Sequence, residues 1–144
     1  MIALGSDHAG FPLKSFIIEY LENNNISYKD FGTHSNDSVD YADYAKKVCQ
    51  SILSGESEKG ILICGTGIGI SITANRFKGI RAALCHNEYT AKLTREHNDA
   101  NILALGERVI GYGLAIDIVE KFLKTPFSND ERHIKRLSKI DENN

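Results

Sequence analysis

Several features that would define a protein class are missing from this sequence of 144 residues. It has three cysteines, an odd number, and none forms a C-x-x-C pair, which argues against a disulfide framework or a metal site. No apolar run is long enough to span a membrane, and no signal peptide follows Met1. The formal net charge of -2 gives no diffuse basic field for nucleic acid or an anionic membrane. We therefore expect a cytoplasmic protein with no metal, no nucleic-acid partner and no membrane partner.

The composition is that of an ordinary globular protein, with 42% hydrophobic and 25% charged residues. The length suits one domain over residues 1–144. Short apolar runs alternate along the chain with stretches of helical spacing. The runs predict strands at 2–4, 26–31, 61–63, 79–85 and 101–106. The helical spacing predicts helices at 11–22, 41–53, 70–75, 88–97, 112–123 and 131–140.

This alternation of strand and helix predicts an α/β fold. We expect a three-layer α/β/α Rossmann-like domain with a five-stranded parallel sheet, helices on both faces and an extra C-terminal helix. The alternating run 26–31 predicts a strand towards an edge. Asp40 or Asp43 is expected to cap the second helix, and Asn87 the fourth. Ligands bind such sheets at the carboxyl ends of the strands, so those ends are where a site is expected.

The most informative stretch is 60–75, a buried strand followed by Gly65, Gly67 and Gly69 and then by a helix. A glycine-rich turn before a helix offers backbone N–H groups to an anion. Cys64 ends the strand, where the helix N-terminus favours its ionisation. The glycine spacing fits neither the dinucleotide fingerprint nor the phosphate loop of nucleotidases. On spacing alone, a tight turn of an ordinary α/β domain remains an alternative.

Other polar residues also follow the predicted strands. Asp7 and His8 follow the first strand, and Arg108 follows the fifth. Arg132 and Arg136 lie four residues apart, so they share one helix face and suit a phosphate, although a solvated basic face is the alternative. The remaining polar or reactive residues are expected to carry no chemistry: Cys49 as a core residue, Cys85 and His86 at a strand end, and His133 and Lys135 on the surface.

Five segments together resemble the type B ribose-5-phosphate isomerases, a family that includes the galactose-6-phosphate isomerase subunits. The resemblance covers nearly the whole chain and departs at Ala42, where the family commonly has proline. The chain is of the type with cysteine rather than glutamate in the central loop. The segments are Gly5-Ser6-Asp7-His8-Ala9-Gly10, Asp40-Tyr41, Ile63-Cys64-Gly65-Thr66-Gly67-Ile68-Gly69, Glu96-His97-Asn98-Asp99-Ala100-Asn101 and Arg132-His133-x-x-Arg136.

The resemblance implies interconversion of D-ribose 5-phosphate and D-ribulose 5-phosphate through an enediolate, without a metal or a nucleotide cofactor. It also implies a homodimer or dimer of dimers, with each site near the subunit boundary. An enzyme for a hexose 6-phosphate, such as allose or galactose 6-phosphate, is the nearest alternative. A non-catalytic phosphosugar-binding or nucleotide-binding module is a further alternative, against which the presence of Cys64, Thr66 and His97 argues.

The resemblance also implies a role for each site residue. Cys64 is expected to be the base, His97 the acid that opens the sugar ring, and Thr66 a proton relay or hydroxyl ligand. The N–H groups of 65–69 are expected to stabilise the enediolate. His8 and an Arg108 from the partner are expected to join Arg132 and Arg136 at the phosphate. The expected substrate-binding residues are Asp7, His8, Tyr41, Gly65, Gly67, Ile68, Gly69, Asn98, Arg108, Arg132 and Arg136.

Overall fold

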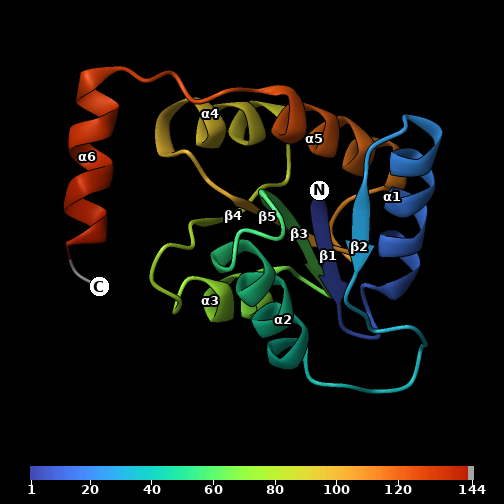
Figure 1. Cartoon of the computed structure of the whole chain (residues 1–144). Coiled ribbons are helices and arrows are strands. Elements are labelled where there is room, and N and C mark those ends of the chain that lie inside the picture. The colour runs from blue at the N-terminus through green and yellow to red at the C-terminus, as the bar shows by residue number, and fades with distance from the viewer. Residues whose placement is uncertain (143–144) are drawn as a thin grey trace.

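A computed structural model describes residues 1–142 of the chain. Its centre is a five-stranded sheet in the order β2-β1-β3-β5-β4, with every neighbouring pair parallel. The strands are β1 (Ile2–Ser6), β2 (Tyr28–Asp30), β3 (Lys59–Cys64), β4 (Ala82–Leu84) and β5 (Ile102–Gly106). The expected three-layer α/β architecture is confirmed, and β2 lies at an edge as predicted (Figure 1).

Helices cover both faces of the sheet because successive strand residues point to opposite sides. Ile61 and Ile63 face one core cluster with α1, α4 and α5, whereas Leu62 and Cys64 face the other with α2 and α3. The helices are α1 (Phe11–Asn23), α2 (Tyr41–Leu53), α3 (Ile68–Ala74), α4 (Glu88–Asn98), α5 (Tyr112–Lys124) and α6 (Glu131–Asp141). None within residues 1–142 has the length and apolar character needed to cross a membrane.

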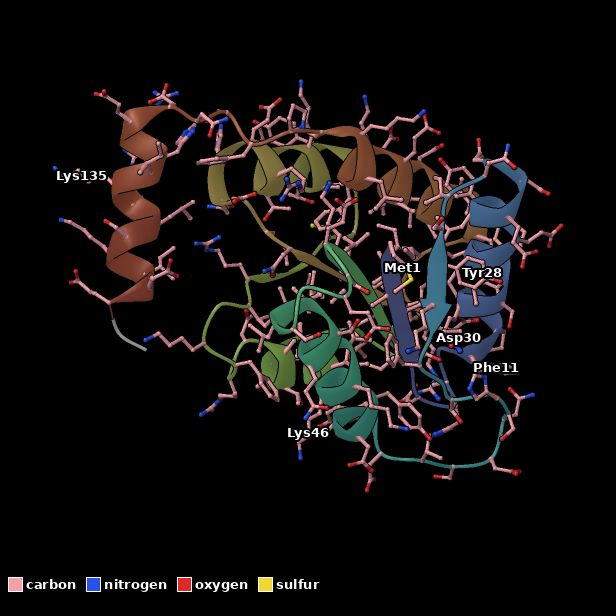
Figure 2. All side chains as sticks on the ribbon, in the orientation of Figure 1. Met1, Phe11, Tyr28, Asp30, Lys46 and Lys135 are labelled. Atoms are coloured by element: carbon pink, nitrogen blue, oxygen red, sulfur yellow. The ribbon has the colours of Figure 1, made fainter. Side chains whose placement is uncertain are left out.

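The C-terminal helix α6 stands apart from the three layers. Figure 1 shows it beyond the end of α4, joined to α5 by an extended segment. Only His133 and Leu137 of this helix are buried. Arg81 anchors its far end, since its Nη2 donates to Asp141 Oδ2 at 2.9 Å. Lys135 points away from the body of the protein in Figure 2, which confirms its predicted surface position.

The predicted elements all exist, with differences at their ends. The predicted strands 26–31 and 79–85 shorten to three residues each, because edge strands have a partner on one side only. Asn87 caps α4 as expected, its side chain accepting from Thr90 N at 2.8 Å. Asp40 occupies the N-cap position of α2 but makes no side-chain cap hydrogen bond, and Asp43 lies inside the first turn.

Candidate active site

The carboxyl ends of β1, β3 and β5 surround a surface depression of about 510 Å³. Parallel strands bring their carboxyl ends to one edge, which is why segments far apart in sequence meet here. The depression holds most of the residues predicted around the glycine-rich loop. Its lining is Asp7, Tyr41, Cys64, Gly65, Thr66, Ile68, Gly69, Ile72 and Arg108.

Cys64 is the reactive-residue candidate in this depression. Its Sγ accepts a hydrogen bond from the N–H of Gly67 at 3.1 Å. Gly67 reaches that position with φ of 78°, a left-handed conformation that suits glycine. A backbone donor so close to sulfur stabilises negative charge on it.

The other two thiols lie in a different environment. Cys49 is fully buried in the core, as predicted, and burial raises its pKa to about 12. Burial also raises the pKa of Cys85, against a smaller opposite effect of its hydrogen bond with Thr90. Both groups therefore remain protonated near neutral pH, and Cys64 is the thiol placed for chemistry.

The loop leaves fewer free donors than the sequence predicted. Gly67 N–H is directed at the Cys64 sulfur, and Ile68 N–H donates to Thr66 Oγ1 at 3.2 Å. The N–H groups of Gly65, Thr66 and Gly69 remain as candidates for an anionic oxygen. Gly69 also allows a close approach by Tyr41, because a Cβ at this position would lie 2.5 Å from the tyrosine Cζ.

Asp7 and His8 shape the loop after β1. Asp7 Oδ1 accepts from Gly10 N at 3.0 Å, which closes the turn before α1. His8 Nδ1 accepts from Val39 N at 3.1 Å and ties this turn to the polar loop before α2. His8 therefore belongs with the Cys64 side of the molecule and does not lie beside Arg132 and Arg136 within the chain.

Arg108 lies against the glycine-rich loop of its own chain. Its backbone N–H donates to Gly65 O at 3.0 Å, and its Nη1 would lie 3.0 Å from a Cβ added to Gly65. The side chain is exposed. It therefore brings a positive charge to the depression without requiring a second subunit.

Two supporting residues were missed by sequence reasoning. Glu107 donates its N–H to Cys64 O at 2.9 Å, and its carboxylate accepts from Leu13 N and from Tyr112 Oη. It thus links the glycine-rich loop to the starts of α1 and α5. No residue pattern marks Glu107, because its partners come from separate parts of the chain.

The second supporting residue is Lys14, which is fully buried. Its Nζ pairs with Asp30 and donates to Thr33 O at 2.7 Å. Burial lowers the pKa of Lys14, and the Asp30 carboxylate opposes that effect. Figure 2 places Asp30 at the end of β2, near Phe11 at the start of α1. The pair fixes the loop that follows β2. The sequence spacing does indicate that Lys14 is buried, because it lies three and seven residues before the buried Ile17 and Leu21 on the same helix face.

His97 and Asn98 lie at the opposite end of the sheet from Cys64. They end α4, four residues before β5 begins at Ile102. Cys64 pairs in register with Gly106, at the far end of β5. Five strand residues separate these ends by about 13 Å. The structure therefore does not bring His97 to Cys64 within one chain.

Arg132 and Arg136 lie on α6 and line a separate depression of about 300 Å³ with Lys135 and Lys139. They do share one helix face, as predicted. His133 does not lie on the surface, and that prediction was wrong, because this side chain is only 4% exposed and packs against His97. Within residues 1–142, no cluster of three or more His, Cys, Asp or Glu side chains could hold a metal ion.

Known proteins match this chain over nearly its whole length. The profile of the Ribose/Galactose Isomerase family matches residues 2–140. Ribose-5-phosphate isomerase B of Escherichia coli is 47% identical over 139 residues, 96% of this chain and 93% of that protein. A solved ribose 5-phosphate isomerase from Thermotoga maritima is 57% identical, with a TM-score of 0.96 and coverage of 98% and 97% of the two chains.

A third match was solved with a bound sugar phosphate. It is ribose-5-phosphate isomerase B of Mycoplasma genitalium with ribulose-5-phosphate. It is 39% identical to this chain, with a TM-score of 0.92 and coverage of 99% and 94%. Fold, family profile and identity agree over nearly the whole chain, and the chain belongs to the ribose/galactose isomerase family.

Proposed function

We propose that this protein interconverts D-ribose 5-phosphate and D-ribulose 5-phosphate, with Cys64 as the base. The observation that carries the proposal is the hydrogen bond from Gly67 N–H to Cys64 Sγ within the depression at the strand ends. The Escherichia coli relative and the Mycoplasma genitalium structure with ribulose-5-phosphate support a pentose phosphate over a hexose phosphate. We further propose that residues 1–144 act as one domain in the cytoplasm.

The proposed chemistry moves one proton between two carbons. The Cys64 thiolate removes the proton from carbon 2 of the open-chain aldose, and the carbonyl oxygen on carbon 1 takes up negative charge. Free N–H groups of Gly65, Thr66 and Gly69 are available to stabilise that charge, and each such donor is worth roughly 3–4 kcal/mol in other enzymes. The hydrogen on oxygen 2 then moves to oxygen 1. Cys64 returns its proton to carbon 1, which leaves the carbonyl at carbon 2.

Ribose 5-phosphate is mostly a closed ring, so a second acid must open it. We assign this step to His97, because histidine is the side-chain type best suited to exchange a proton under physiological conditions. His97 donates a proton to the ring oxygen as the bond from carbon 1 to that oxygen breaks, and the hydroxyl on carbon 1 loses its proton to water. Asn98 is assigned to a sugar hydroxyl, and Arg132 and Arg136 to the phosphate.

These assignments require two copies of the chain. His97 lies about a strand length away from Cys64. A two-fold dimer can place the α4 and α6 residues of one protomer over the loop of its partner. Exposed apolar side chains around the depression support such an interface. Ile68, Ile72 and Val109 are 51%, 54% and 50% exposed, which is unusual for a surface that faces only water.

Substrate class is tested by incubating the protein with ribose 5-phosphate, allose 6-phosphate and galactose 6-phosphate in parallel, with a colour test for ketose. We expect the pentose phosphate to react fastest. Cys64→Ala should abolish turnover while sugar-phosphate binding survives, and Cys49→Ala is the matched control. Faster turnover of a hexose phosphate would show that the substrate is a hexose phosphate. If none of the three sugar phosphates gave a ketose, the protein would instead be a binding module.

The shared site is tested by mixing two variants that are each defective. One is Cys64→Ala, and the other carries both Arg132→Ala and Arg136→Ala. In a randomised one-to-one mixture, half of the dimers are mixed, and each mixed dimer has one intact site if the site is shared. Activity at low substrate should recover to about a quarter of wild type. A site built within one chain would give no recovery.

A further inference from the structure

His133 is buried on a helix that otherwise buries only Leu137. It is 4% exposed, although Arg132 beside it is an exposed residue. Leu137, one turn later, already supplies a buried apolar side chain on the same helix. A buried histidine at this position therefore calls for a reason beyond attachment of the helix.

The contacts of His133 lead directly to His97. The two rings pack with centroids 4.3 Å apart at an interplanar angle of 34°. On its other side, His133 Nδ1 lies 2.7 Å from Ser128 Oγ. Ser128 is itself fixed, because its N–H donates to Glu96 O at 3.1 Å and its Oγ accepts from Asp130 N at 3.1 Å. A closed set of contacts thus runs from α4 through Ser128 and His133 back to α4.

The surroundings of His133 also act on its own protonation. Burial lowers the pKa of His133, with His97, Arg132 and Arg136 adding to the effect and Asp130 opposing it. These surroundings favour the neutral form of His133. A neutral ring adds no positive charge beside His97. An acid for sugar-ring opening must carry a proton before it donates it.

We propose that His133 is a positioning residue, which holds the His97 ring in the orientation that opens the sugar ring through its stacking contact and its bond to Ser128. The inference rests on the proposed isomerase function and on the assignment of His97. It gives His133 a task separate from the phosphate contact assigned to the neighbouring arginines. Displacing a reacting group by about 1 Å can cost on the order of 100-fold in rate, so fixing one ring has a measurable effect.

The test uses the two reaction directions of the whole protein. Ribulose 5-phosphate cannot close a five-membered ring, because its oxygen 5 carries the phosphate, so it needs no ring-opening acid. Three variants separate the contacts. His133→Asn keeps a polar partner for Ser128 and removes the ring, His133→Phe keeps a ring and removes the polar partner, and Ser128→Ala leaves both histidines. His86→Asn, at an exposed histidine, is the matched control.

We expect His133→Asn to lower kcat/KM for ribose 5-phosphate by about 10-fold to 100-fold. Its rate should also stop rising as enzyme is added, once spontaneous ring opening limits the reaction. Its initial rate with ribulose 5-phosphate should stay proportional to enzyme. His133→Phe should retain more ribose 5-phosphate activity than His133→Asn. Ser128→Ala should show a smaller loss, again with a ceiling for ribose 5-phosphate and none for ribulose 5-phosphate.

A rate with ribose 5-phosphate that stays proportional to enzyme at every level in both His133→Asn and Ser128→Ala, as it does in the wild type, would overturn the positioning role. Ser128→Ala keeps the test valid if His133→Asn fails to fold. His97→Asn is run alongside. If His97→Asn shows the ceiling and the His133 and Ser128 variants do not, only the positioning role is overturned. If the wild type isomerises no aldose phosphate, the proposed function falls, and the role of His133 falls with it.

Discussion

Replacing Gly67 with alanine tests the central loop, because this one residue combines a special backbone conformation, close packing and the N–H bound to Cys64. Its φ is 78°, and an added Cβ would lie 2.5 Å from Leu84 Cδ1 and 2.9 Å from the carbonyl carbon of Leu105. The leucine side chain can rotate away, but the backbone of β5 is buried and paired. The loop must therefore move if the alanine is to fit.

Two matched controls separate the contributions of backbone strain and of overpacking to the expected loss of unfolding free energy. Gly55 has φ of 82° and nothing within 4 Å of an added Cβ, so Gly55→Ala measures the backbone strain alone, about 1 kcal/mol. Gly113 lies in α5 without positive φ and also faces open space, so Gly113→Ala should be neutral or stabilising by about 0.5 kcal/mol. Gly67→Ala adds overpacking of roughly 1–3 kcal/mol to the strain, which gives about 2–4 kcal/mol in total.

Two measurements check this. Urea unfolding at one fixed protein concentration gives the free energy of unfolding of each variant. Isomerase assays give kcat, and we expect Gly67→Ala to lose about 10-fold to 100-fold because a hydrogen bond to a charged sulfur is worth about 1.5–3 kcal/mol. Gly55→Ala and Gly113→Ala should keep wild-type kcat. If Gly67→Ala were no less stable than Gly55→Ala, or kept its kcat, our account of the loop would be wrong.

Three further predictions concern the thiols and the buried lysine. Iodoacetamide near pH 8 should modify Cys64 alone, which intact mass and loss of activity would show. The pKa of the Cys49 thiol is about 12, so only about one part in 10,000 of it is thiolate at that pH. Preferential labelling of Cys49 would contradict this prediction. Because the folded pKa of Cys49 exceeds its unfolded value of 9.0, the folded state binds more protons, and stability should fall as pH rises from 9 towards 12, by up to about 1.4 kcal/mol per pH unit. Cys49→Ala should flatten that slope in urea titrations, and an unchanged slope would refute the assignment. Lys14→Met should lower the unfolding free energy by about 3 kcal/mol, because it leaves the Asp30 carboxylate without its partner. The double variant Lys14→Met with Asp30→Leu should recover much of that loss. Equal losses in the single and double variants would show that the ion pair is not the cause.

The α/β architecture was predictable because its signals are local. Each buried strand is a short apolar run, such as 61–63, and each helix shows regular spacing of apolar residues. The strand order β2-β1-β3-β5-β4 was not predicted, since it depends on pairing between segments far apart in sequence. The strand-end half of the site followed from the same local signals, because a parallel sheet brings Asp7, Cys64 and Arg108 to one edge.

The α4 and α6 part of the proposed site was predicted only through family resemblance, and its distance from Cys64 within one chain was not predicted. The segment from Arg132 to Arg136 has the composition of a solvated helix, so nothing local indicates that His133 is buried. Its burial arises from Ser128 and His97, which come from a loop and from another helix. Glu107 was missed for the same reason, since a single carboxylate joins three separate segments.

The placement of His97 follows from the geometry of a parallel α/β unit. Each helix begins where one strand ends and returns the chain to the start of the next strand. A residue at the end of α4 therefore lies one strand length from the edge that carries Cys64, whatever its sequence. In the proposed dimer, a second copy related by a two-fold axis would remove this separation, because each protomer would offer its α4 and α6 residues to the loop of the other. Under the proposed function, catalysis therefore requires the dimer. Activity per subunit should fall when the protein is diluted below the concentration at which the dimer dissociates.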